Sequence, residues 1–352
     1  MPGTYDQIRD LPLTIDGYDL EALERAGGPD FVRRTTVFHL RGGGHEGLGE
    51  DVTYGEPEQL AQQQAGPVLD LVGDWTLDAF SRHLGVLELF AGAEPAMPAS
   101  YEYRRWAVES AALDLALRQN DTSLHAALGR EPQPLRFGVS LRIAGSADPV
   151  RARLDAYGPM GFKLDYEAEW SEALIADLAG TGAVDVVDFK GAYKGTVVDV
   201  DTVAEVYRRC AEAFPDAWLE DPDLTDADAA AVLAPHHDRV TWDAPIHSVA
   251  DIVRFGIEPR CLNCKPSRFG ALSALLDFYD HCEAKGIALY GGGQSELGPG
   301  RGQIQLLAAL FHPDGPNDVA PAGWDQAEFP RTGLPTSPLD PAPDDLGFRR
   351  AA

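Results

Sequence analysis

The sequence predicts an α/β protein in which a (β/α)8-type barrel, a modified TIM barrel, follows an N-terminal α+β domain. From about residue 135 onwards, short apolar strands alternate with amphipathic helices. Repeated βα units with short loops imply parallel strands, and eight such strands imply a closed barrel. A chain of 352 residues is long enough for a barrel and a smaller domain.

The first 130 residues have a different pattern. RRTTVFHL (33–40) is rich in strand-forming residues, and GLGEDVTYG (47–55) follows a Gly-rich turn, so we expect a hairpin with a mobile tip. Residues 76–93 and 101–129 read as helices, the second with an apolar stripe at helical spacing. EPQP (131–134) is typical of a linker that follows the end of a helix.

We therefore expect an α+β domain over residues 1–130 and the barrel over 135–325. The Pro-rich tail 326–352 is expected either to pack on the first domain or to be partly disordered. The eight predicted strands span residues 136–144, 161–166, 184–191, 217–222, 239–245, 261–267, 287–293 and 317–321. An open doubly wound sheet is the alternative. It is less favoured because no G-x-G-x-x-G opens a helix after any of these strands.

The composition restricts the possible partners and the compartment. A net charge of −27 repels phosphates and anionic membranes, so we expect no nucleic acid and no membrane partner. We interpret the charge as an adaptation of the surface to solubility or salt. The sequence shows no signal-peptide pattern, no apolar window of membrane-spanning length and only four cysteines, which predicts a cytoplasmic protein.

Ionisable residues stand at the ends of five successive predicted strands, where a barrel places its active site. They are Lys163 and Asp165, Asp188 and Lys190, Glu220, Asp243, and Lys265. Barrel interiors are normally filled by Val, Ile and Leu, so this repetition indicates a functional cavity rather than solvated loops. The register that turns Lys265 inward puts Cys261 and Cys264 on opposite faces, which argues against a shared metal for this C-x-x-C pair.

Asp188, Glu220 and Asp243 together make a site of hard oxygen ligands, which suits one Mg²⁺ ion. Lys163 and Lys265 would flank that ion from opposite sides. Such an arrangement favours removal of a proton α to a substrate carboxylate through an enediolate, with a lysine as the base.

At these motifs the sequence resembles the enolase superfamily, and within it the muconate-lactonizing subgroup. The motifs are GLGE (47–50), AVESAALDLALR (107–118), FKLD (162–165), DFK (188–190), LEDP (219–222), WDAP (242–245), NCKPSRFG (263–270) and GGGQSELG (291–298). The resemblance implies Mg²⁺, a capping domain over the barrel mouth, a small-molecule carboxylate substrate and a homo-oligomer. It also implies epimerisation, cycloisomerisation or o-succinylbenzoate-forming elimination as the reaction.

Two residues depart from the family pattern. Asp165 stands where the family has the second lysine of Lys-x-Lys, and Lys190 stands where it has an asparagine. We expect either that Lys190 does the work of the missing lysine or that Asp165 and Lys190 form a structural ion pair. A third possibility is a metal-binding pseudoenzyme.

Substrate contacts are expected from Ser295 and Glu296 on the seventh strand segment. His45 on the glycine-rich turn either reaches the substrate as the loop closes or is a solvated loop residue. Arg142 at the end of the first strand either holds a second carboxylate of the substrate or, in a register shifted by one residue, lies on the surface. An acid-sugar dehydratase is the alternative enzyme. It usually needs a histidine on the seventh strand, and GGGQSELG has none.

Overall fold

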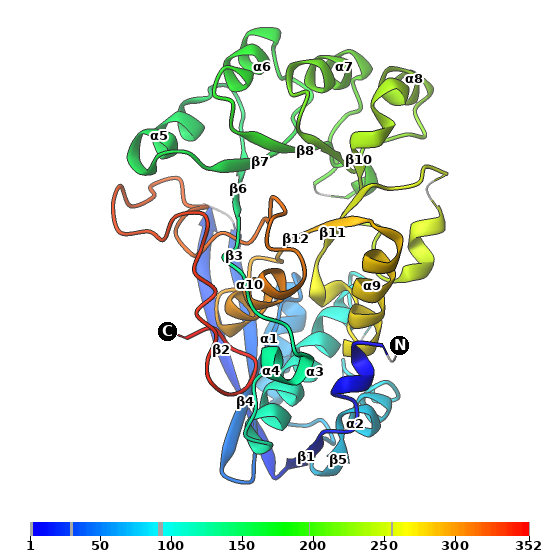
Figure 1. Cartoon of the computed structure of the whole chain (residues 1–352), viewed down its shortest axis with the longest axis vertical. Helices are drawn as coiled ribbons and strands as arrows, with labels where there is room; N and C mark the ends of the chain where they lie inside the picture. The colour runs from blue at the N-terminus through cyan, green and yellow to red at the C-terminus, as the bar shows by residue number, and fades with distance from the viewer. Residues whose placement is uncertain (1–2, 29–30, 91–93, 197, 255, 352) are drawn as a thin grey trace.

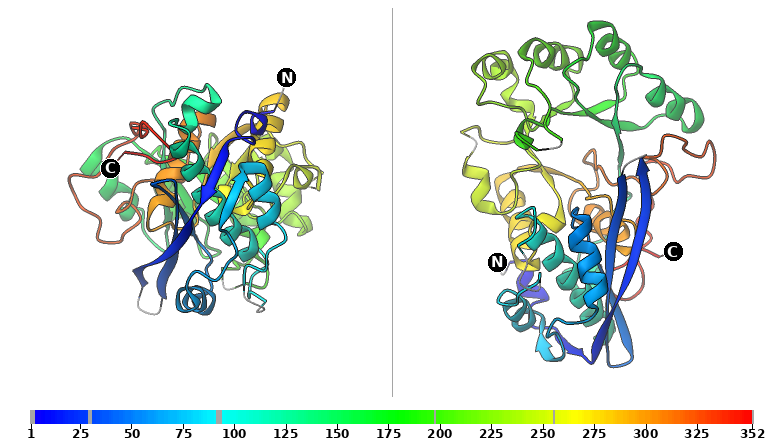
Figure 2. Two further views of the ribbon diagram at one scale, coloured as in Figure 1. Left: turned by 90° about the horizontal axis from the view of Figure 1, so that it is seen from below. Right: turned by 180° about the vertical axis from the view of Figure 1, so that it is seen from behind.

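The structure, a computed structural model, describes residues 3–28, 31–90, 94–196, 198–254 and 256–351. The molecule is elongated, with strands β1 (Pro12–Ile15) and β5 (Gly73–Thr76) at one end of its long axis (Figure 1). Helices α5 (Asp148–Tyr157), α6 (Glu172–Ala179), α7 (Ala204–Ala213) and α8 (Ala227–Leu233) lie at the other end. Helices α9 and α10 lie between these two ends. The view from behind in Figure 2 shows the same stacking, with the long strands of the N-terminal sheet reaching up toward the barrel.

The N-terminal part contains an antiparallel sheet of three strands in the order β2-β3-β4, with the bounds Gly17–Gly28, Phe31–Gly42 and His45–Asp51. Strands β3 and β4 form the predicted hairpin. Strand β2 was not predicted, because its sequence GYDLEALERAGG is rich in Leu, Glu, Ala and Arg, which favour helices. Pairing with β3 along almost its whole length overrides that preference.

Helices cover this sheet. The helices and short strands here are η1 (Tyr5–Gln7), β1 (Pro12–Ile15), α1 (Glu56–Ala65), β5 (Gly73–Thr76), α2 (Leu77–Leu84), α3 (Ser100–Gln119) and α4 (Leu124–Leu128). Helix α3 packs so closely on β4 that a Cβ on Gly47 or Gly49 would lie 2.2 or 1.9 Å from a carbonyl oxygen of the helix. The glycines of GLGE therefore allow this contact between helix and strand.

Both predicted N-terminal helices are longer than the observed ones. The first ends at Leu84, before Gly85, and residues 91–93 of its predicted span lie outside the described residues. The second is split between α3 and α4. Asp121 has a φ of 50° at the break, and the Ser123 side chain caps the new helix by accepting from the Ala126 amide.

The predicted (β/α)8-type barrel is confirmed. Strands β6 (Gly138–Arg142), β7 (Gly161–Asp165), β8 (Val184–Asp188), β9 (Trp218–Glu220) and β10 (Val240–Thr241) form one parallel sheet, and β11 (Cys261–Cys264) and β12 (Ala288–Gly291) form another. The intervening helices are α5 (Asp148–Tyr157), α6 (Glu172–Ala179), η2 (Gly191–Tyr193), α7 (Ala204–Ala213), α8 (Ala227–Leu233), η3 (Ala234–Arg239), η4 (Val249–Arg254), η5 (Pro266–Arg268), α9 (Leu272–Lys285) and α10 (Pro299–Phe311).

Single hydrogen bonds link the two parallel sheets. On one side the Asn263 amide donates to the Trp242 carbonyl at 3.0 Å. On the other side, Asn317 and Asp318 form bridges to Phe137 and Gly292. The predicted eighth strand is thus reduced to two bridges, which stand between β12 and β6.

Two buried charged residues fasten the N-terminal part to the barrel. The Arg33 guanidinium donates to the carbonyls of Val52 and Thr53 at 2.7 and 2.9 Å and to that of Gln294 at 2.8 Å. The Glu50 carboxylate accepts from backbone amides just before and within the first turn of α10, including that of Gly300 at 3.0 Å. These bonds hold the β4–α1 connection against the segment that follows β12.

The C-terminal segment contacts both parts of the molecule. Leu339 pairs with Leu135 in an antiparallel bridge, and Gly347 pairs with Ser123 in a parallel one. The buried Asp114 of α3 accepts from the Phe348 amide at 2.7 Å and from the Arg349 guanidinium at 2.5 Å.

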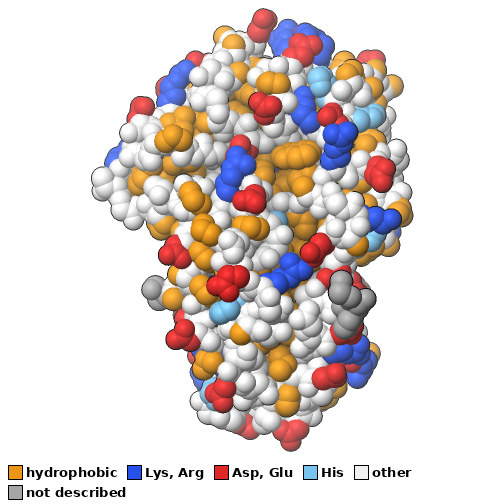
Figure 3. All heavy atoms as spheres, in the orientation of Figure 1, with side chains coloured by type: hydrophobic (Ala, Val, Ile, Leu, Met, Phe, Trp, Pro, Cys, Tyr) orange, Lys and Arg blue, Asp and Glu red, His pale blue; other side chains and the backbone are white. Residues whose placement is uncertain are grey.

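The distribution of charged side chains on the surface fits the net charge of −27. On the face shown in Figure 3, Lys and Arg side chains lie in separate small groups among acidic ones. Within the described part of the chain, the helices are all too short or too polar to span a bilayer.

Replacing the buried Arg104 by alanine should destabilise the fold strongly. Its guanidinium lies 2.8 Å from Asp51, which is also buried, and donates to the Leu89 carbonyl at 3.0 Å. Arg104→Ala would leave the Asp51 charge buried without its partner, so we expect a loss of about 3–5 kcal/mol in the free energy of unfolding. Urea denaturation followed by circular dichroism measures it.

The matched control is Arg82→Ala, which removes an arginine from an ion pair with Asp78 while 68% of the arginine side chain is exposed. An exposed pair contributes at most about 1 kcal/mol. Equal losses of unfolding free energy in the two variants would contradict the interpretation that burial makes the Arg104–Asp51 pair important for stability.

Candidate active site

Three carboxylates meet at the carboxyl ends of adjacent barrel strands. Asp188 ends β8 and pairs in register with Glu220 at the end of β9, while Asp243 follows β10. All three are buried, and one ligand oxygen from each lies within 4.8 Å of the others. Three hard oxygen donors at this separation fit a divalent cation.

Basic side chains surround this acidic group. The Lys163 ammonium contacts Glu220 and lies 3.2 Å from Asp188 Oδ2. The Lys265 ammonium lies 2.9 Å from Asp243 Oδ2, and the Arg268 guanidinium lies 2.6 Å from Asp243 Oδ1. The two lysines therefore approach the acidic group from different strands, Lys163 from β7 and Lys265 from the residue after β11.

Burial and charge together change the acidity of these groups. Burial opposes ionisation of Asp243, but Arg268 and Lys265 hold its pKa below its usual range. Burial raises the pKa of Glu220 well above its ordinary value, although Lys163 opposes this. Burial and the Asp243 charge also raise the pKa of Asp221 to about 7. The pKa values of neighbouring carboxyls in this region are therefore shifted in opposite directions.

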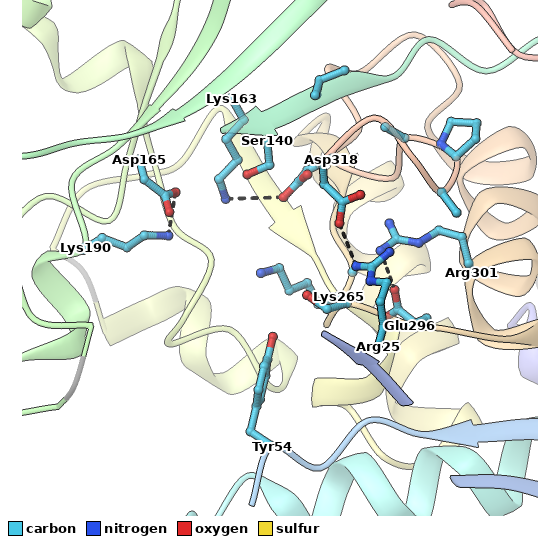
Figure 4. A pocket seen from close by; sticks show the side chains of 17 residues that line it. Arg25, Tyr54, Ser140, Lys163, Asp165, Lys190, Lys265, Glu296, Arg301 and Asp318 are labelled. Atoms are coloured by element: carbon cyan, nitrogen blue, oxygen red, sulfur yellow. Dashed lines mark hydrogen bonds and ion pairs between the residues drawn. The ribbon is translucent and has the colours of Figure 1, made fainter. Parts of the chain in front are cut away.

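A cavity of about 240 Å³ lies beside the acidic group and is lined by both Lys163 and Lys265 (Figure 4). Its barrel side is lined by Ser140, Lys163, Asp165, Lys190, Lys265 and Asp318, and two further residues, Arg25 and Tyr54, reach it from the N-terminal part. The predicted Ser295 and Glu296 also line it, and Glu296 lies 3.1 Å from the guanidinium of Arg301. The cavity is thus a small, strongly polar chamber suited to a charged small molecule.

The two residues that depart from the family pattern lie side by side. The Lys190 ammonium is 2.9 Å from Asp165 Oδ1 and also contacts Asp188 Oδ2. Lys190 has a φ of 57°, in the left-handed region, so its backbone turns sharply directly after β8. The ion pair between Asp165 and Lys190 is present.

His45 and Arg142 do not reach this cavity. His45 pairs with Gly42 at the tip of the β3–β4 hairpin, and this tip lies beside Thr14 and Gln119. Because the tip points away from the barrel, His45 lies far from the cavity. The opposite end of β2 faces the barrel instead and brings Arg25. Arg142 is half exposed and lies 3.0 Å from Glu167, so an acidic neighbour holds it outside.

Several residues of the site were not predicted. Arg25 and Tyr54 had no local signal, because only the long-range contact between the two parts brings them to the barrel. Asp318 follows the rule of ionisable groups at strand ends and could have been found from NDVAP (317–321). Arg268 stands within the NCKPSRFG motif, and only the structure shows its contact with Asp243.

Comparison with known proteins defines the family. A family model described as the C-terminal domain of a domain of unknown function, DUF8230, matches residues 131–326, and the model of its N-terminal domain matches residues 6–127. The chain belongs to the DUF8230 family.

Curated relatives match part of the chain. An N-succinylamino acid racemase from Amycolatopsis sp is 30% identical over 226 residues, which cover 61% of this chain and 59% of the relative. An o-succinylbenzoate synthase from Geobacillus stearothermophilus is 25% identical over 224 residues, covering 61% of this chain and 58% of the relative. Each match therefore spans less than two thirds of the relative.

The fold is shared more widely. The crystal structure of an enolase-superfamily member from Listeria innocua superposes with a TM-score of 0.63 at 18% identity, covering 90% of this chain and 88% of that one. This likeness shows a shared fold, and together with the two curated relatives it confirms the predicted resemblance to the enolase superfamily.

Divalent cations should stabilise the protein through the three acids. Mg²⁺ at about 100 times its Kd would add about 2.7 kcal/mol to the free energy of unfolding, seen as a higher Tm. Asp188→Asn should abolish this increase. Asp185→Asn, on the same strand at its other end and paired with Arg136, should keep it. An equal increase in Tm with Mg²⁺ in both variants would contradict a cation site formed by the three acids.

Binding of the cation should release protons. Because burial raises the pKa of Glu220, a proton competes with the cation for the oxygens of this carboxyl. We therefore expect the affinity for Mn²⁺ to increase as the pH is raised. Calorimetry in two buffers of different ionisation enthalpy measures the release. An affinity that does not change between about pH 6 and pH 8 would exclude this linkage.

Proposed function

We propose that this chain is an Mg²⁺-dependent enzyme that removes the proton α to a carboxylate of a small-molecule substrate. The observation that carries the proposal is the cluster of three buried acids at the mouth of a barrel, between two lysines that themselves line a polar cavity. The names of the relatives, a racemase of N-succinylamino acids and an o-succinylbenzoate synthase, support the same class of chemistry.

Asp188, Glu220 and Asp243 would hold the ion. When bound, it would hold the substrate carboxylate and stabilise the negative charge that develops as the α-proton leaves. The remaining chemistry is done by side chains of the chain itself, which bind the substrate and move the proton.

Lys265 is our candidate for the base. It lines the cavity, and among the described residues Asp243 is the one acid within ion-pair distance of its ammonium. Lys163 lies deeper, against both Glu220 and Asp188, and would stabilise negative charge on the substrate as a fixed cation. We assign Lys190 to charge balance because two carboxylates hold its ammonium.

This arrangement favours a reaction that uses one base. Racemisation through two bases requires proton donors on both faces of the substrate carbon, and Asp165 stands where the family has the second lysine. An elimination or cycloisomerisation needs a base on one face only. We therefore rank a one-base reaction, such as one that forms o-succinylbenzoate, above racemisation.

Residues at the far end of the cavity would contact the rest of the substrate. Ser295 lies there with a φ of 56°, and Glu296 and Arg301 form a pair 3.1 Å apart. An acid-sugar dehydratase is less favoured, because no histidine is found among the described residues that line the cavity. We also propose, from the resemblance, a homo-oligomer that works in the cytoplasm.

The test is exchange of the α-proton in deuterated water. N-succinyl amino acids, dipeptides and acid sugars are incubated with protein and Mg²⁺, and loss of the α-proton signal is followed by NMR, with a chelator as the control. We expect exchange that the chelator stops. Lys265→Ala should slow it by about 10²-fold or more.

Lys285→Ala is the matched control, since this exposed lysine of α9 lies outside the cavity. Undiminished exchange in Lys265→Ala would reject Lys265 as the base. No exchange on any substrate, with the cation shown to be bound, would reject the reaction class and favour a pseudoenzyme.

A further inference from the structure

The position of Lys190 has a direct effect on the proposed cation site. Its ammonium contacts Asp188 Oδ2 and lies 2.9 Å from Asp165 Oδ1. The side chain is largely buried, and its ammonium also faces the ring of Tyr193, whose centroid is 5.7 Å away. Lys190 is therefore shared between one of the three acids and a carboxylate outside them.

Lys190 contacts the same oxygen of Asp188, Oδ2, that Lys163 contacts from the side of Glu220. Asp188 Oδ1 accepts the backbone N–H of Lys190 itself at 3.1 Å, so this oxygen is already engaged. Asp188 Oδ2 faces Lys163, whose ammonium also contacts Glu220. A divalent cation bound by all three acids would thus need the oxygen that the Lys190 ammonium contacts.

We propose that Lys190 is a tethered cation that competes with the divalent ion for Asp188, and that Asp165 accepts the displaced ammonium when the ion binds. The inference rests on the proposed function only for its premise that the three acids bind a divalent ion. It gives the two unusual residues one shared role. Lys190 keeps Asp188 neutralised without the ion, and Asp165 supplies a second position for the ammonium.

Two charge changes then have opposite effects on affinity. Lys190→Asn removes the competitor, so the Kd for the ion should fall by at least about tenfold. Asparagine tolerates the left-handed backbone at this position better than most residues do. Asp165→Asn removes the alternative acceptor, so Lys190 is held on Asp188 alone and the Kd should rise by a similar factor.

The double variant separates this mechanism from simple electrostatics. If Asp165 acts through Lys190, Asp165→Asn should have almost no effect in the Lys190→Asn background. If Asp165 merely attracts cations to the site, its removal should weaken binding equally in both backgrounds.

The experiment measures Mn²⁺ alone, without substrate, by calorimetry and by the EPR signal of free Mn²⁺, for the full chain and its variants. Lys194→Asn is the matched control for loss of one positive charge, since Lys194 is exposed and pairs with Asp199 and Asp223 instead. Its Kd should stay within about twofold of the parent.

An unchanged or higher Kd in Lys190→Asn would overturn the proposal, as would an undiminished effect of Asp165→Asn in the double variant. Should Lys190→Asn fail to fold, Asp165→Asn keeps the proposal falsifiable, because the proposal requires a higher Kd and an unchanged or lower Kd rejects it. These measurements use no substrate. A failure of the proposed α-proton reaction would therefore leave the Kd for Mn²⁺ unchanged, and the two proposals can be rejected independently.

Discussion

The structure depends on mutual neutralisation of charges that could not be buried singly. Asp188, Glu220 and Asp243 occupy strand ends that a barrel would otherwise fill with apolar side chains. Each of these carboxylates has a basic partner among Lys163, Lys190, Lys265 and Arg268, which are themselves mostly or fully buried. Removing one member would leave its partner with an uncompensated charge in a low-dielectric site. The conformation of this part of the barrel is therefore fixed by its charges as much as by its apolar core.

The N-terminal part completes the chamber that these charges face. Arg33 binds carbonyls of both the β4–α1 connection and the segment after β12, so one side chain fixes Tyr54 and Ser295 relative to each other. Glu50 does the same for the start of α10, which carries Arg301. Shape at the cavity mouth is thus set by two buried charged residues that do not line it.

The sequence alone allowed the barrel and its acidic centre to be predicted, because strand ends of a parallel sheet meet at one edge. That rule needs only the alternation of strands and helices and the positions of Asp188, Glu220 and Asp243. It also placed Cys261 and Cys264 on opposite faces. The structure confirms this, since Cys261 packs with Val186 inside the barrel, whereas Cys264 belongs to a separate apolar cluster that contains residues of α9.

Features that depend on how the two parts dock could not be predicted in this way. A hairpin sequence gives no direction in space, so His45 was expected at the cavity and Arg25 was not. Strand β2 follows its pairing with β3 against its own helical preference. Arg142 lies on a predicted strand, yet Glu167 holds its side chain outside, and nothing in the spacing of the sequence indicates that pairing.

The positions of the four cysteines allow local opening of the fold to be followed by thiol labelling. All four thiols are free and buried, and they lie in different places: Cys210 on α7, Cys261 inside the barrel, and Cys264 and Cys282 where β11 packs on α9. A thiol reagent in solution therefore reacts only when the surrounding element opens. Mass spectrometry of the labelled peptides would give the order in which the helix, the barrel interior and the strand–helix contact open, without any introduced probe.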